Sequence, residues 1–133
     1  MSDLEGPDII IQPPDDQKQF RQIDVIAEIG WQTHIAWERI IGEQPKPDWS
    51  ALSPGQKVAV VDSVRWLIEH PTSSVAAQHD AWRARMAGEG WEVAFTKNSS
   101  KKVHPNMEHF DDIPFPQQMK ARLWRHIIFA VLG

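Results

Sequence analysis

The stretch SPGQKVAVVDSVRWLIE, residues 53–69, decides the fold class. Its valines alone would fit a β-strand, but its apolar residues recur at helical spacing and do not alternate. Its start also carries a helix cap. Ser53 can accept from the first free backbone N–H groups, Pro54 suits the first helical position, and Gln56 can close a capping box. The stretch therefore predicts a helix from Pro54 to about Glu69.

Helical spacing also marks the segments on both sides of this stretch. Upstream, apolar residues recur three and four apart from Phe20 to Ile41, and Gly42 supplies a stop. Downstream, serines at 73 and 74 can cap a helix over residues 75–87. A final helix is predicted over about residues 117–132; it is apolar on more than one side and is expected to be the central one.

Residues 91–116 keep no helical period. Short apolar pieces alternate at Trp91, Val93 and Phe95, and polar and proline-containing sequence follows them. This segment is expected to be irregular chain with at most a short β-hairpin. The sequence therefore predicts a mainly α domain of about four helices with a short β-hairpin or irregular segment.

The N-terminal stretch, residues 1–19, has a different composition from the rest. It holds five acids against one base, together with Pro7, Pro13 and Pro14, so we expect an acidic, largely flexible tail before a domain of residues 20–133. Its isoleucine run, Ile9 to Ile11, is unusual for a solvated arm. We expect that run either to be solvated or to dock, on its own domain or on a partner subunit.

Composition excludes several classes of function. There is no cysteine, which removes disulfides, thiol catalysis and thiolate zinc sites. No apolar run approaches a membrane span, and Met1 to Gly6 lacks the features of a signal peptide, so a cytoplasmic protein is expected. After the tail, acids and bases balance, and a pI near 5.8 argues against nucleic-acid binding.

Seven tryptophans without a single tyrosine point to some indoles outside the core. Trp37, Trp66 and Trp124 lie on helical apolar stripes and are predicted to be core residues. For Trp82 and Trp91 a pocket and the core remain equal alternatives, because one ends the quartet at 79–82 and the other begins the irregular segment.

The histidines raise the question of a metal site. His34, the pair His79-Asp80, and Asp111 or Asp112 follow the order of a histidine/aspartate metal phosphohydrolase. Helical phase, however, places His79 beside Trp82 rather than at a metal. No phosphate loop or nucleophile elbow is visible either, so we expect no metal, no cofactor and no catalytic residue, and keep the phosphohydrolase as a third alternative.

Several motifs in one order are similar to the repeat domain of ryanodine receptors, over roughly residues 23 to 132. The shared motifs are H-x-x-W at His79 to Trp82, the pair Gly90-Trp91, K-x-H-P at Lys102 to Pro105, and an aromatic-acid-Pro run at Phe110 to Pro114. The chain resembles most the stand-alone single-repeat proteins of bacteria and their phages. It departs from the family pattern at Val93, Ala94, Asn98 and Ala121.

The resemblance implies a helical binding domain rather than an enzyme. In the receptors, repeats occur as pairs, and the tryptophan of H-x-x-W can flank an adenine nucleotide at the pair interface. Carried over, this implies a homodimer that binds an adenine- or ADP-ribose-type nucleotide, with stacking by Trp82 and, in second place, by Trp91. Lys102 and His104 are candidates for phosphate contacts. Two further histidines, His79 and His34, complete the candidate ligand-binding residues. The alternative from another class is a protein-interaction or inhibitor domain, phage-encoded and acting on a host protein in the host cytoplasm.

The placement of the first apolar period at Ile23 generates a stability prediction. Deleting residues 1–8 should leave the melting temperature nearly unchanged, because the predicted core begins after them. Thermal denaturation of the full and shortened chains checks this. A loss of many degrees would show that these residues belong to the fold.

Overall fold

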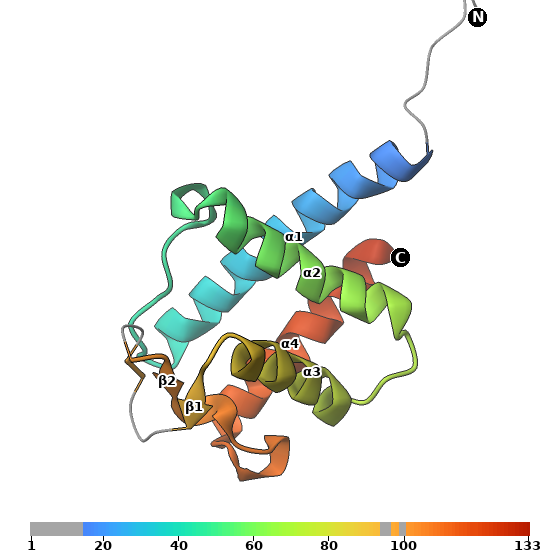
Figure 1. Ribbon diagram of the computed structural model, residues 1–133. Coiled ribbons are helices and arrows are strands. Elements are labelled where there is room, and N and C mark those ends of the chain that lie inside the picture. The colour runs from blue at the N-terminus through green and yellow to red at the C-terminus, as the bar shows by residue number, and fades with distance from the viewer. Residues whose placement is uncertain (1–14, 94–96, 99–100) are drawn as a thin grey trace, which may run out of the picture.

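The computed structural model describes residues 15–93, 97–98 and 101–133 (Figure 1). Its main elements are four helices and two short strands: α1 (Asp15–Ile40), α2 (Pro54–Glu69), α3 (Val75–Gly88), β1 (Glu92–Val93), β2 (Val103–His104) and α4 (Phe115–Leu132). Three single-turn 3-10 helices, η1 (Trp49–Ala51), η2 (Pro105–Met107) and η3 (Phe110–Asp112), join them. The mainly α architecture with a short β segment is confirmed. The isoleucine run at 9–11 and Ala94 lie outside the described residues.

The capped helix α2 forms as the sequence predicts. The Ser53 hydroxyl accepts from the Gln56 N–H at 3.2 Å, and the Ser53 N–H donates to the Gln56 side chain at 2.8 Å. Ser74 caps α3 in the same way, accepting from the Ala77 N–H at 3.0 Å. Both starts are specified locally, which is why sequence alone places them.

The other two helices begin earlier than predicted. α1 starts at Asp15 rather than at Phe20. α4 starts at Phe115 rather than at residue 117, and includes Pro116 in its first turn. Proline is tolerated there because the N–H it lacks would have no helical partner.

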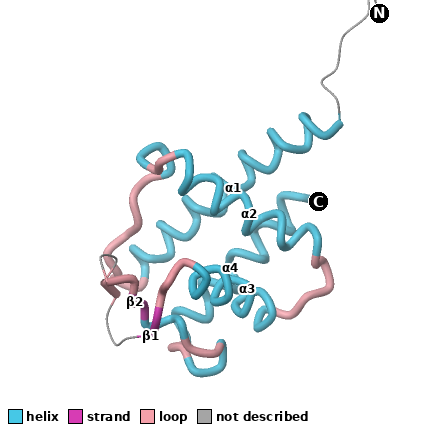
Figure 2. The backbone as a smooth tube through the Cα atoms, viewed as in Figure 1, coloured by secondary structure: helices cyan, strands magenta, loops and turns pink. Residues whose placement is uncertain are grey.

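The β segment is a parallel pair of two short strands, and so is not the short β-hairpin that was one of the two predicted alternatives. β1 and β2 lie beside each other (Figure 2). They pair in parallel, with Glu92 opposite Val103 and Val93 opposite His104. An antiparallel bridge joins Asn98 to Val103. Alternation predicts an extended chain, but it says nothing about the neighbour with which that chain pairs.

The core lies where α1, α2 and α4 meet. Its buried cluster comprises Ile23, Ile26, Ala27, Val61, Val64, Leu67, Trp124 and Ile128. α4 contacts each of the other three helices, and so does α2 (Figure 1). Of the three tryptophans predicted to be core, Trp124 is buried, whereas Trp66 packs at the edge of the cluster and Trp37 is half-buried.

Gly30 of α1 lies in close contact with Trp124 of α4. A Cβ atom added to Gly30 would lie 2.5 Å from Cζ3 of the indole and 2.9 Å from Cε3. The indole is 7% exposed and is held by surrounding core residues, so it has no room to retreat. Glycine at this position therefore allows α1 and α4 to pack closely, and it is not needed for an unusual backbone conformation.

Gly30→Ala should destabilise the fold by about 1–3 kcal/mol through overpacking, although alanine is the better helix former. Gly55→Ala in α2 is the matched control, because nothing lies within 4 Å of a Cβ added there. Urea denaturation measures the free energy of unfolding of both variants, which should fall for Gly30→Ala and should not fall for Gly55→Ala. Equal or greater stability of Gly30→Ala would contradict the packing argument.

Candidate functional site

Four of the six predicted site residues form one continuous row of rings, which we call the aromatic row: His79, Trp82, His104 and Trp91. The His79 and Trp82 rings stack with centroids 5.5 Å apart. His104 meets Trp82 edge-on at 5.4 Å and Trp91 at 6.2 Å, tilted by 60°. The row thus joins two half-buried indoles through one imidazole.

Hydrogen bonds join helix α3 to the segment that follows β2. These bonds hold His79 and Trp82, the first two residues of the row, in position. The buried His79 ring meets the Glu108 carbonyl through Nε2 at 2.8 Å. One turn further along α3, the Arg83 side chain donates to the Met107 carbonyl at 2.9 Å. Burial, the largest influence, lowers the pKa of His79. His79 therefore acts as a fixed support behind the indole of Trp82.

The end of α3 turns the chain so that Trp91 reaches the row. Gly90 takes a left-handed conformation, with φ of 93°. Its N–H donates to Ala87, and the Trp91 N–H donates to Met86, both at 3.0 Å. These are the two bonds of a Schellman motif, and glycine suits its left-handed position best.

His104 sits at the centre of the row as a neutral ring. Its Nδ1 accepts from the Asn106 N–H at 3.0 Å, so the ring proton is on Nε2. Burial, followed by the nearby charges of Lys97, Lys120 and Lys46, lowers the pKa of His104 to about 4. At neutral pH His104 therefore offers one N–H donor, at Nε2, beside two indoles.

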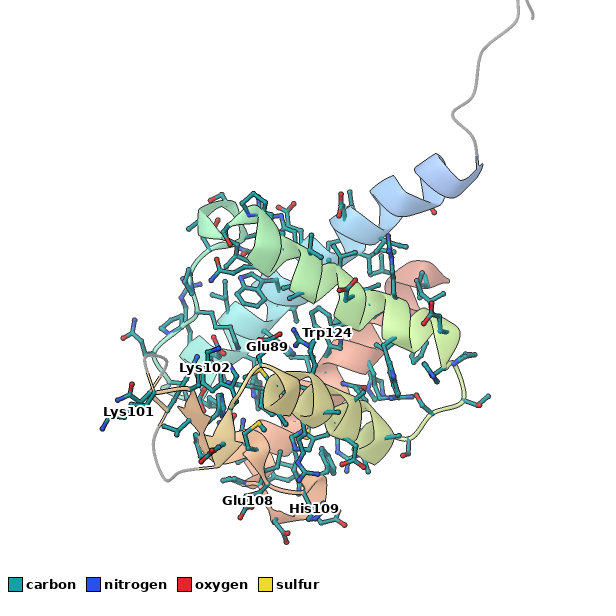
Figure 3. All side chains as sticks on the ribbon, in the orientation of Figure 1. Glu89, Lys101, Lys102, Glu108, His109 and Trp124 are labelled. Atoms are coloured by element: carbon teal, nitrogen blue, oxygen red, sulfur yellow. The ribbon has the colours of Figure 1, made fainter. Side chains whose placement is uncertain are left out.

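The two remaining predicted residues lie outside the row. The Lys102 ammonium donates to the Glu89 carbonyl at 2.7 Å and so joins the corner after α3 to the turn before β2 (Figure 3). His34 lies on α1, where Nε2 meets the Lys120 carbonyl at 2.8 Å and the ring centroid is 5.2 Å from that of Trp124. Burial, as the largest cause, lowers the pKa of His34 to about 4. His34 is thus part of the α1–α4 contact.

A charged network that sequence analysis did not identify lies between His34 and His104. Its centre is Glu38, 2% exposed, which accepts from the Lys46 N–H at 2.9 Å, from the Lys46 ammonium, and from the Lys120 ammonium at 3.0 Å. Burial alone would raise the pKa of Glu38, but the hydrogen bonds from Lys46 and Lys120 outweigh it and lower the pKa to about 2. The carboxylate is therefore ionised and fully paired.

The network continues to the row. Lys120 also pairs with Glu43 at 2.7 Å, and Glu43 accepts from the Gln117 side chain. The Gln117 side chain accepts from the Asn106 amide at 2.9 Å, and the backbone of Asn106 donates to His104. The one local signal for this network is the Pro45-Lys46-Pro47 connector, and its partners are too distant in sequence to be read from it.

The residues named for a metal phosphohydrolase do not converge. Nε2 of His79 is on a backbone carbonyl, and Asp80 pairs with Arg83 at 3.2 Å. Asp111 and Asp112 are exposed in η3. Across residues 15–93, 97–98 and 101–133, no group of three or more His, Asp or Glu side chains is arranged to hold a metal ion.

Comparisons of the chain with protein-family models, with curated proteins and with solved structures found no match. In the described part of the chain, none of the helices has the length and apolar character needed to cross a membrane. Function must therefore be argued from the aromatic row and its surroundings.

The lowered pKa values of His34 and His104 predict that the stability of the fold depends on pH. In the unfolded chain the two histidines bind protons near pH 6.5, but in the folded protein only near pH 4. The unfolded state therefore holds more protons between these values, and the free energy of unfolding falls as the pH falls from 6.5 to 4, by at most about 1.4 kcal/mol per pH unit for each ring. His104 is partly exposed, so its share is smaller.

Denaturation at several pH values measures this slope, and His34→Gln should make it shallower. NMR titration of the imidazole protons gives the independent check. Midpoints near 6.5 for His34 and His104 would contradict the assignment.

Proposed function

We propose that this protein is a non-catalytic module that binds a small adenine-type nucleotide at the aromatic row. The observation that carries the proposal is the meeting of Trp82 and Trp91 at the neutral ring of His104. Half-buried indoles offer π-faces at a fixed position, and base stacking on an aromatic side chain contributes ~1–3 kcal/mol.

The indole of Trp82 is held in place by its neighbours, and this favours a role in ligand binding. His79 is stacked on the indole and bonded to Glu108, so the indole is held before a ligand arrives. A ligand then loses less binding energy to the ordering of side chains. The Nε2–H of His104 supplies a donor suited to a ring nitrogen or a phosphate oxygen.

The charges near His104 favour an anionic ligand. Lys97, Lys120 and Lys46 all act to lower the pKa of His104, which means that they create a positive potential at the ring, with Glu43 opposing them. Lys97 is exposed and so can approach a phosphate. Lys102 is also exposed, and would contact phosphate only by leaving the Glu89 carbonyl.

The resemblance to a ryanodine receptor repeat extends this proposal to a homodimer. A single repeat would supply half of a paired site, so two copies would bring their Trp82 faces together around a two-fold axis. The ligand class that goes with that pairing is an adenine or ADP-ribose nucleotide. A single-repeat protein of bacterial or phage type would then act as a cytoplasmic nucleotide sensor.

A protein-interaction domain is the second candidate, and exposed apolar side chains favour it. Ile40 at the end of α1 is 75% exposed and Phe115 at the start of α4 is 68% exposed. The two helix ends are joined, since the Trp37 indole donates to the Pro116 carbonyl at 3.1 Å. Apolar anchors at one end of the domain suit a host or bacterial protein partner.

A thermal-shift screen against nucleotides should give a stabilising ligand, and Trp82→Ala should weaken its binding roughly 5- to 150-fold. Trp66→Ala is the matched control: this half-buried indole stacks on His70, outside the row, so the affinity of the folded variant should not change. Calorimetry measures both affinities, and sedimentation measures the dimer. Unchanged affinity in Trp82→Ala, together with a monomer at tens of micromolar, would rule out the mechanism.

A further inference from the structure

An apolar groove of about 240 Å³ lies between the first half of α1 and the ends of α2 and α4. Its apolar lining comprises Ile23, Ile26, Ile68, Pro71, Phe129 and Leu132. The first two belong to the buried core and form its floor, whereas Leu132 at the rim is 40% exposed. Figure 1 places these helix ends near the C-terminus, away from β1 and β2.

We propose that the isoleucine run Ile9 to Ile11 of the same chain occupies this groove. The run ends just before α1, which begins at Asp15 and contributes Ile23 and Ile26 to the groove. At 1.5 Å per helical residue, these two side chains lie ~12 to 16 Å along α1 from Asp15. At ~3.3 Å per extended residue, the run reaches ~13 to 20 Å back from the same point.

The sequence between the run and α1 favours this extended path. Gln12 and Pro13 each precede a proline, and a residue before proline prefers extended backbone. Successive side chains of extended chain point to opposite sides. Ile9 and Ile11 therefore face the groove together, and Ile10 faces away, since two apolar side chains remove more surface from water than one.

The short connection favours the chain's own tail over a second copy. Only residues 12–14 separate the run from the described start of α1. A tether of this length holds the run near the groove at an effective concentration of order mM, far above that of another chain at micromolar concentration. Elsewhere in residues 1–14 the sequence is mostly acidic, proline or polar, so this run is the apolar piece that suits the groove.

The absence of cysteine makes a direct test possible, because one introduced cysteine carries a spin label at a single known position. The full chain with Asp8→Cys, labelled with a nitroxide, should broaden the amide signals of Phe129 and Leu132 in NMR spectra. Adding Ile9→Ser and Ile11→Ser should remove that broadening and lower the melting temperature by roughly 5 °C. Ile10→Ser is the matched control and should change neither.

Three results would overturn the proposal. The first is the lack of broadening at Phe129 and Leu132, and the second is equal broadening with and without the two serines. The third comes from a mixture of an isotope-labelled chain without a spin label and a spin-labelled chain without isotopes. Broadening of the isotope-labelled chain's signals in this mixture would place a second copy in the groove. None of these readouts involves a nucleotide, so failure here is distinct from failure of the binding proposal.

Discussion

The close contact of Trp124 with Gly30 is the constraint on which the rest of the structure depends, because it fixes how near α4 lies to α1. Two further contacts follow along the same face of α1 at intervals of four residues. His34 meets the Lys120 carbonyl, and Glu38 meets the Lys120 ammonium. Four-residue spacing keeps side chains on one face of a helix, so a single antiparallel interface changes from apolar to imidazole to carboxylate along its length.

The charged end of that interface determines where the aromatic row lies. Glu38 holds the connector through Lys46 and holds α4 through Lys120, and Glu43, Gln117 and Asn106 extend the chain of bonds to His104. A buried ion pair contributes little net stability against an apolar replacement, but loss of one partner leaves a buried charge unpaired at a cost of about 3–5 kcal/mol. We infer that the network specifies geometry more than it stabilises the fold.

The sequence predicted those features that depend on residues close together in the chain. The Ser53 cap and the Ser74 cap set the starts of α2 and α3, and the H-x-x-W spacing put His79 and Trp82 on one face of α3. The direction of the β pair, the place of His34 and the Glu38 network could not be predicted, since each depends on partners far away in sequence. The contact of Lys102 could not be predicted for the same reason, because its partner, the Glu89 carbonyl, is a backbone group without a sequence signal.

The two ends of α1 contribute to different surfaces, the apolar groove and the aromatic row. The distance between them determines whether a change at one surface affects the other. The apolar groove uses Ile23 and Ile26, whereas the network that leads to the row uses Glu38, which lies ~18 Å further along the helix from Ile26. Effects of changes more than about 7–10 Å apart usually add independently. Coupling between groove and row would therefore require α1 to shift as a rigid body past Trp124. The absence of space at Gly30 opposes such a shift, so occupancy of one surface should leave the geometry of the other unchanged.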